Sequence, residues 1–188
     1  MKPVLSILTP AVWSRREKSE KLAEGLAGQI GDLPVEHLVL MDNRRMTIGE
    51  KRQALLGQAR GLYLAFCDDD DAVSEDYIAH LFAAAGRGQD VITFRQHAVW
   101  NGAESEVHFS INHRDEAFTP GGVTKRRPWH ICAWRADLAK RGIFTSKMWG
   151  EDADWVNQVA PLARSESHIK KVLHFYRHED SESLAMGR

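Results

Sequence analysis

Residues 61–77 read GLYLAFCDDDDAVSEDY, and this stretch carries the strongest indication of the fold. Its residues 62–67 are apolar enough to form a buried strand, and four aspartates follow them directly at positions 68–71. Four like charges at the end of a strand do not ionise together without a free-energy cost, so they need a cationic partner. Because ligands of open α/β sheets bind beyond the carboxyl ends of the strands, the stretch indicates an α/β fold with a binding site here.

The composition sets the broad class of protein. The chain has 188 residues, 25 basic and 26 acidic, with a formal net charge of -1, which argues against a nucleic-acid coat protein and a polyacidic tail protein. This length suits one domain with a hydrophobic core, so residues 1–188 are expected to form a single domain. Cys67 and Cys132 form no disulfide framework and are expected to be buried thiols. The chain shows no signal-peptide pattern and no apolar run long enough to span a membrane, which predicts a soluble cytoplasmic protein.

Apolar runs and helical periodicities alternate through the first half of the chain. Strands are predicted at residues 4–8, 35–42, 62–67, 90–94, 106–111, 129–134 and 168–180. Helices are predicted at residues 14–30, 48–60, 74–86, 136–142 and 149–160. Residues 119–128 are expected to form a mobile loop, with Thr9 and Pro10 in a loop after the first strand. The alternation predicts a mostly parallel sheet with helices on both faces.

Helix ends are marked by capping residues. Thr47 and Glu50 fit a capping box, in which each side chain covers a free backbone amide of the first turn. Gly61 suits the position after the end of that helix. Ser74 is the expected N-cap of the next one.

Asp42 and the aspartates at 68–71 both follow predicted strands, so they are expected to face the same crevice. Mg²⁺ and Mn²⁺ prefer carboxylate oxygens and keep open positions for phosphate. The pattern therefore predicts a divalent ion that bridges protein carboxylates to a diphosphate. The alternative is a solvated acidic loop without a ligand.

Four stretches, in this order, resemble the family 2 glycosyltransferases of the GT-A fold. They are TPAVWSR (9–15), VLMDN (39–43), GEKRQALLGQARGLYLAFCDDDD (49–71) and GEDADW (150–155). The resemblance covers about residues 3–82 and 128–184. It implies a Rossmann-like αβα sandwich, with a nucleotide-binding half at about 1–95 and an acceptor-binding half at about 96–188.

The resemblance also implies a metal and nucleotide site. The DxD motif of the family corresponds to Asp68, Asp69 and Asp70, of which Asp68 contacts the ribose or the metal and Asp70 ligates the metal, Mn²⁺ or Mg²⁺. His178 is a candidate third ligand or diphosphate contact, and its alternative is an exposed histidine. The other residues implied in nucleotide-sugar binding are Asp69, Thr9, Pro10, Arg15, Asp42, Lys51 and Arg52. Gln53 stands where many members have Asn, so the contact at Lys51 and Arg52 departs from the usual Arg-Asn pair.

The Glu-Asp motif of the family corresponds to Glu151 and Asp152. In similar enzymes the aspartate is the general base for the acceptor hydroxyl. A helix N-terminus stabilises a carboxylate as the anion, which suits this role. The alternative is that Glu151 and Asp152 are only favourable first-turn acids. The other histidines, including His130 and His174, are expected to be structural.

The implied function is inverting transfer of a sugar from a nucleoside diphosphate donor, with a UDP-sugar favoured, to an acceptor hydroxyl. The acceptor is left open between a saccharide, a protein and a hydroxylated base in DNA. The basic residues Lys125, Arg126 and Arg127 either close over the diphosphate or are only solvated. Two alternatives remain, a nucleotidyltransferase of similar fold and a binding module that leaves its sugar nucleotide intact.

Overall fold

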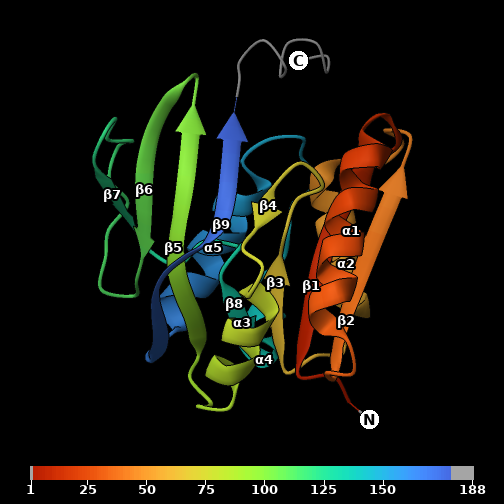
Figure 1. The fold of residues 1–188 in the computed structure, drawn as a ribbon, viewed down its shortest axis with the longest axis horizontal. Coiled ribbons are helices and arrows are strands. Elements are labelled where there is room, and N and C mark those ends of the chain that lie inside the picture. Colours follow the sequence, from red (N-terminus) through yellow and green to blue (C-terminus); the bar gives the residue numbers. More distant parts are fainter. Residues whose placement is uncertain (1, 179–188) are drawn as a thin grey trace.

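The computed structural model describes residues 2–178, which form one sheet with helices on both faces (Figure 1). The strands are β1 (Leu5–Val12), β2 (Val35–Asp42), β3 (Tyr63–Phe66), β4 (Ala72–Val73), β5 (Val91–Trp100), β6 (Ala103–Phe109), β7 (Val123–Arg126), β8 (Ala133–Arg135) and β9 (Glu166–His178). The helices are α1 (Arg16–Ile30), α2 (Ile48–Gln58), α3 (Tyr77–Ala85), α4 (Ala136–Ala139) and α5 (Glu151–Val159), with 3₁₀ turns at Trp13–Arg15 and Ala160–Leu162. Within residues 2–178, no helix is both long and apolar enough to cross a membrane.

The main path of the sheet runs β2-β1-β3-β8-β5-β6-β7, with β9 beside β5 and β4 beside β9. The two longest ladders, β5 with β9 and β1 with β2, are parallel, as are β1 with β3 and β6 with β7. The antiparallel ladders are β3–β8, β4–β9, β5–β6 and β5–β8. Most paired residues therefore lie in parallel ladders, and the predicted α/β fold with a mostly parallel sheet is confirmed.

Helices cover the sheet in two groups. α1 contacts α3 on one face, and α2 contacts α5 on the other (Figure 1). α1 presents Leu22 and Leu26 to the core, one turn apart, while charged residues occupy its other side. All four residues of β3 are buried, because helices and neighbouring strands surround this central strand. The end of β3, where the four aspartates begin, is thus fixed by the core.

Several strands extend further than their sequence patterns indicated. β1 continues to Val12 because it pairs with β2 as far as Asp42, so Thr9 and Pro10 lie in a strand and the loop prediction there was wrong. The predicted loop at 119–128 was also wrong in part, since β7 pairs with β6. Thr124 turns inward there, and its hydroxyl lies 2.8 Å from that of Ser105. The last strand is described to His178, and the predicted residues 179–180 lie outside the described part.

The helix caps were predicted with mixed success. The Thr47 hydroxyl accepts from the Glu50 amide at 3.1 Å, and the Glu50 carboxylate accepts from the Thr47 amide at 2.7 Å, so the capping box is confirmed. Ser74 does not cap α3; its hydroxyl donates to the Asp76 carboxylate, and Asp76 is the N-cap residue. The predicted place of Gly61 directly after the helix was wrong, because α2 ends at Gln58 and Ala59 is its C-cap. Gly61 is instead required for close packing, because a Cβ there would lie 2.6 Å from the Ser6 amide nitrogen.

Candidate active site

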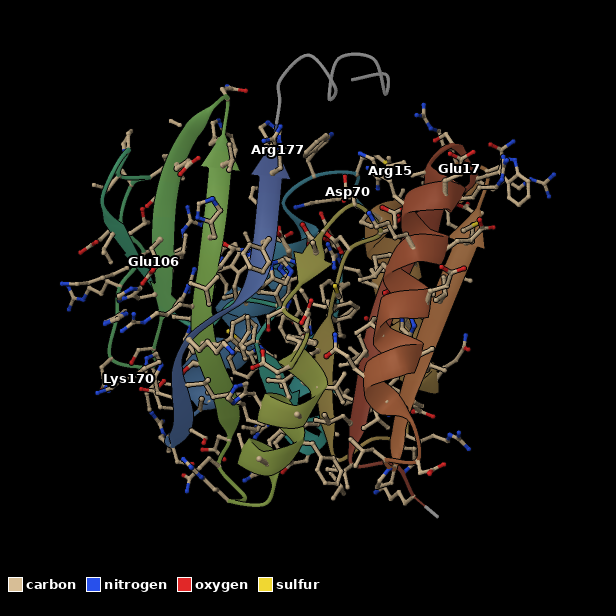
Figure 2. The ribbon with its side chains drawn as sticks, viewed as in Figure 1. Arg15, Glu17, Asp70, Glu106, Lys170 and Arg177 are labelled. Atoms are coloured by element: carbon tan, nitrogen blue, oxygen red, sulfur yellow. The ribbon has the colours of Figure 1, made fainter. Side chains whose placement is uncertain are left out.

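A cavity of about 520 Å³ opens at the carboxyl ends of β1, β3 and β9. Figure 2 shows Arg15 and Asp70 beside each other, with Arg177 at the same end of the sheet. Of the residues implied by the sequence, the cavity is lined by Arg15, Lys51, Arg52, Asp68, Asp70, Glu151, Asp152 and His178. The structure therefore brings most of the predicted site together from both halves of the chain.

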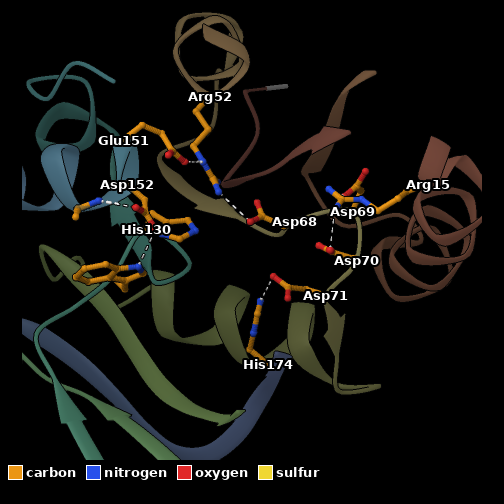
Figure 3. A network of polar contacts seen from close by, with 12 residues as sticks. Arg15, Arg52, Asp68, Asp69, Asp70, Asp71, His130, Glu151, Asp152 and His174 are labelled. Atoms are coloured by element: carbon orange, nitrogen blue, oxygen red, sulfur yellow. Dashed lines mark hydrogen bonds and ion pairs between the residues drawn. The ribbon is translucent and has the colours of Figure 1, made fainter. Parts of the chain in front are cut away.

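The aspartates after β3 point in different directions (Figure 3). Asp69 is fully buried, accepts a hydrogen bond from the Val12 amide at 2.9 Å and pairs with Arg15. Asp70 faces the cavity and pairs with the other amino group of Arg15 at 2.9 Å. Arg15 thus anchors the start of the helical segment on two carboxylates. Asp69 does not line the cavity, so it supports the site through its contact with Arg15.

Arg52 joins the two halves of the site. Its guanidinium is buried and donates to Asp68 at 2.8 Å and to Glu151 at 3.0 Å, while it lies over the ring of Phe66. Burial opposes ionisation of Asp68, but Arg52 outweighs it, so the pKa of Asp68 lies below its usual range. Burial raises the pKa of Glu151 although Arg52 opposes this. The contact makes Glu151 a structural partner of Arg52 as well as a residue of the cavity wall.

Asp71 is paired with His174, a contact that the sequence analysis did not expect. β4 pairs with β9 so that Val73 lies opposite His174, and this brings the imidazole Nε2 to 3.2 Å from the Asp71 carboxylate. On its other side, His174 Nδ1 lies 3.1 Å from Nε2 of the Gln96 side chain in β5. Burial raises the pKa of Asp71, and His174 offsets part of this effect. The pair fixes the end of the aspartate loop.

Lys51 and Asp42 hold the ends of β1 and β2 together. The buried Lys51 ammonium lies 2.5 Å from the Asp42 carboxylate and donates to the Ala11 carbonyl at 2.7 Å. Asp42 also accepts from the Arg45 and Met46 amides, both at 2.7 Å, and so closes the turn after β2. Burial opposes the ionisation of Asp42, but these donors lower its pKa. Asp42 does not line the cavity, whereas Lys51 does.

Thr9 and Pro10 are not at the cavity wall. Both are buried in β1, and the Thr9 hydroxyl lies 2.9 Å from His37 Nε2 in β2. Val12 occupies the cavity wall where β1 ends. Thr9 and Pro10 therefore do not line this cavity, because the strand continues past them, and their contact with a nucleotide stays a prediction.

Asp152 stands across the cavity from the aspartates, in the first turn of α5. Gly150 precedes this helix with φ 76°, a conformation that favours glycine and turns the chain sharply into it. The Trp129 indole donates to Asp152 Oδ2 at 3.2 Å. His130 Nδ1 lies 3.6 Å from the same oxygen, beyond hydrogen-bond distance. One carboxylate oxygen of Asp152 is thus oriented by Trp129, which precedes β8.

His130 and His174 are the site residues that the sequence analysis missed. Burial and the neighbouring Arg52 lower the pKa of His130 to about 4, so the imidazole is neutral at pH 7. Neither histidine lies in a motif, and only the folded chain brings them to Asp152 and Asp71. The sole signal in the sequence was that each occurs in a strand-like apolar segment, where a polar side chain requires an explanation.

The residues near Asp70 fit a divalent cation. Burial and the neighbouring Asp71, Asp68 and Asp69 raise the pKa of Asp70 to about 7, although Arg15 acts in the opposite direction. Asp68 Oδ1 is buried without a hydrogen-bond partner among the described residues. A bound cation would relieve both features, and oxygen ligands suit Mn²⁺ or Mg²⁺.

The predicted three-ligand set is not assembled. Within residues 2–178, no three His, Cys, Asp or Glu side chains converge as a metal site. His178 lies at the cavity wall with its ring centroid 4.2 Å from that of Trp100. Its role as a ligand stays a prediction, and the fit to a metal rests on Asp68 and Asp70.

Comparisons with known proteins identify a family and similar folds. A sequence model described as glycosyl transferase family 2 matches residues 14–157. Comparison with curated proteins gives no match. Among solved structures, S. aureus TarS 1-349 in complex with UDP-GlcNAc is similar, with a TM-score of 0.67 and 15% identity over 100% of this chain and 62% of that one.

Two further TarS structures are similar in fold. TarS 1-349 has a TM-score of 0.64 and 16% identity over 94% of this chain and 60% of that one. Its complex with UDP has a TM-score of 0.62 and 15% identity over 98% of this chain and 63% of that one. The chain thus spans somewhat less than two thirds of these proteins. The likeness confirms the predicted GT-A fold.

Proposed function

The chain belongs to glycosyl transferase family 2, and on this premise we propose that it is a metal-dependent, inverting glycosyltransferase that uses a nucleoside diphosphate sugar. One observation carries the proposal: a single cavity places Asp68 and Asp70 opposite Asp152, with basic side chains between them. Similar structures hold UDP-GlcNAc or UDP, which favours a UDP-sugar as the donor.

The donor side is built by the nucleotide-binding half at about residues 1–95. Asp70 and Asp68 would hold Mn²⁺ or Mg²⁺, which supplies positive charge against the leaving diphosphate. Arg15 and Lys51 contribute further positive charge at the cavity wall. Arg52 links the donor side to α5 through its ion pair with Glu151.

The acceptor side is built by the half at about residues 96–188. Asp152 accepts the proton of the acceptor hydroxyl as its oxygen attacks the anomeric carbon. The bond from that carbon to the diphosphate oxygen breaks, and its electron pair leaves with the diphosphate. Attack from the face opposite the leaving group inverts the anomeric configuration. Trp129 orients Asp152 through its indole N–H.

Thermal unfolding with nucleotides tests the donor site. The protein is heated with UDP, GDP, CDP or dTDP, each with and without Mn²⁺. A ligand at about 100 times its Kd adds about 2.7 kcal/mol to the free energy of unfolding, which raises Tm by roughly 5–10 °C at this chain length. We expect the rise with UDP only when Mn²⁺ is present.

Two substitutions sharpen this test. Asp70→Asn should abolish the rise, whereas Asp32→Asn, at an exposed turn, should keep it. Asp152→Asn should keep the rise but slow release of UDP from UDP-sugars by about 10²–10⁴-fold, the usual contribution of a general base. Absence of a rise with every nucleotide would refute the proposed donor site.

A further inference from the structure

The cavity continues beyond Asp152 along the β5–β6–β7 side of the sheet, which lies away from β1 and β2 in Figure 1. Its surface there is largely apolar. We call this surface the aromatic wall, defined by Trp100 at the end of β5, Phe118 before β7, Trp129 before β8 and Tyr176 in β9. Ala98, Val107, Phe109 and Ile131 close it from behind, and all four are buried.

The aromatic wall begins at the proposed general base. Trp129 reaches Asp152 through its indole N–H, and the Arg126 guanidinium lies over the Trp129 ring at 5.5 Å. No aspartate or glutamate between residues 96 and 131 lines the cavity. In that stretch the lining polar side chains are Gln96, Arg126 and His130.

Gln96 and Arg126 have different contacts in the protein, and the Arg126 guanidinium keeps its N–H groups able to donate. Gln96 contacts His174, and Arg126 covers Trp129. Tyr176 with its hydroxyl, Arg177 and His178 also line the cavity on this side. The wall itself is made by four aromatic side chains, so a ligand there must bury apolar surface against them.

His130 differs from these polar side chains because it is buried and, within residues 2–178, unpaired. Its side chain is 6% exposed, and neither ring nitrogen has a hydrogen-bond partner among the described residues. Buried polar groups in native proteins nearly always have a partner, so this imidazole points to a ligand group that completes it. Nδ1 lies 3.6 Å from Asp152 Oδ2, so a hydroxyl bound to Asp152 would also lie near the imidazole (Figure 3). A neutral imidazole offers one donor and one acceptor to such a group.

We propose, on the basis of the function above, that the aromatic wall is the acceptor subsite and that it takes a hydroxyl carried by a flat, largely apolar ring. His130 is then a substrate-binding residue that contacts the acceptor hydroxyl beside Asp152. A saccharide acceptor would place a hydroxyl on nearly every ring carbon against four aromatic side chains, which pack best on apolar surface. An aromatic ring buries its faces against apolar and aromatic side chains and needs only its reacting hydroxyl bound.

Two small probes distinguish these acceptor classes. Benzyl alcohol and methyl β-D-glucopyranoside both carry a hydroxymethyl group on a six-membered ring, but only the first ring is aromatic. Binding of each is measured by saturation-transfer NMR titration, with UDP and Mn²⁺ present and in their absence. We expect a Kd for benzyl alcohol at least tenfold lower than that for the glucoside.

Substitutions locate the binding. Trp100→Ala should weaken benzyl alcohol binding about fivefold, in line with the usual worth of an aromatic contact. His130→Val should abolish the preference for benzyl alcohol over benzyl methyl ether, which lacks the hydroxyl. Both variants should keep the Tm rise with UDP and Mn²⁺, which shows that they are folded. Val39→Ala, at an exposed position on β2 away from the cavity, is the control and should leave the Kd unchanged.

The two arms of the experiment separate the two proposals. Equal or tighter binding of the glucoside, or benzyl alcohol binding that neither variant changes, would overturn the acceptor inference. A missing Tm rise with UDP and Mn²⁺, with the preference for benzyl alcohol retained, would contradict the proposed donor site alone.

Discussion

Replacing Arg52 with Met should destabilise the protein strongly. The guanidinium is 3% exposed and is held between Asp68 at 2.8 Å and Glu151 at 3.0 Å. Methionine fills a similar volume but leaves the buried Glu151 and the partly exposed Asp68 without their cation. Breaking a buried ion pair from one side usually costs about 3–5 kcal/mol. For a chain of this length that cost lowers Tm by roughly 6–20 °C.

A matched exposed pair provides the control. Arg60 also bridges to a carboxylate, Glu36 at 2.8 Å, but its side chain is 73% exposed. Arg60→Met should cost at most about 1 kcal/mol, because water screens exposed pairs. Both variants are measured by urea unfolding of the metal-free protein at pH 7.

A double-mutant cycle tests the cause of the effect. If the cost of Arg52→Met comes from the orphaned carboxylates, then adding Glu151→Gln should recover about 1 kcal/mol or more, so the two changes are not additive. Additive effects, or a cost for Arg52→Met no larger than that for Arg60→Met, would refute the reasoning. Arg52 would then contribute through packing alone.

Three further predictions concern the site and its support. In EDTA at pH 8, Asp70→Asn should raise Tm by a few degrees, because one of four neighbouring like charges is removed; a lower Tm by calorimetry would contradict this. Gly49→Ala should lower the free energy of unfolding by about 1–3 kcal/mol, since its Cβ would lie 1.8 Å from the Thr145 carbonyl oxygen. Gly57→Ala in the same helix has open space and should raise it by up to about 1 kcal/mol. Equal effects of the two substitutions in urea unfolding would contradict this reasoning. Burial lowers the pKa of His37 to about 4, so the unfolded chain binds more protons between pH 6.5 and 4 and stability falls as pH falls through that range; His37→Gln should flatten that part of the curve, and an unchanged slope would show that His37 does not cause it.

The sequence was informative where chemistry and chain order coincide. The aspartates at 68–71 could be placed at a sheet edge because an apolar strand runs directly into them. Asp152 could be placed in the first turn of a helix because the family motif coincides with the start of α5, while its role as general base stays a prediction. The capping box at Thr47 was predictable because all of its atoms lie within one turn.

The sequence was less informative where partners are distant in the chain. His174 meets Asp71 because two residues of β4 pair with β9, and no local pattern indicates a ladder that short. β7 was not recognised because its residues are mostly charged or exposed, and only Thr124 turns inward. Lys51 and Arg52 have the residue types of phosphate-binding groups, but the fold buries both, and each binds carboxylate or carbonyl groups of the protein itself.

The position of β6 and β7 at the open end of the sheet has a consequence for evolution and engineering. Within the described residues, β6 pairs with β5 and β7 only, and it takes no part in the contacts of Arg52, Lys51 or Asp71. This segment can therefore diversify through insertion or exchange while the donor machinery keeps its geometry. Because β6 also contributes Val107 and Phe109 to the core, a library in the segment from β6 to β7 would keep these two residues and vary the positions around them.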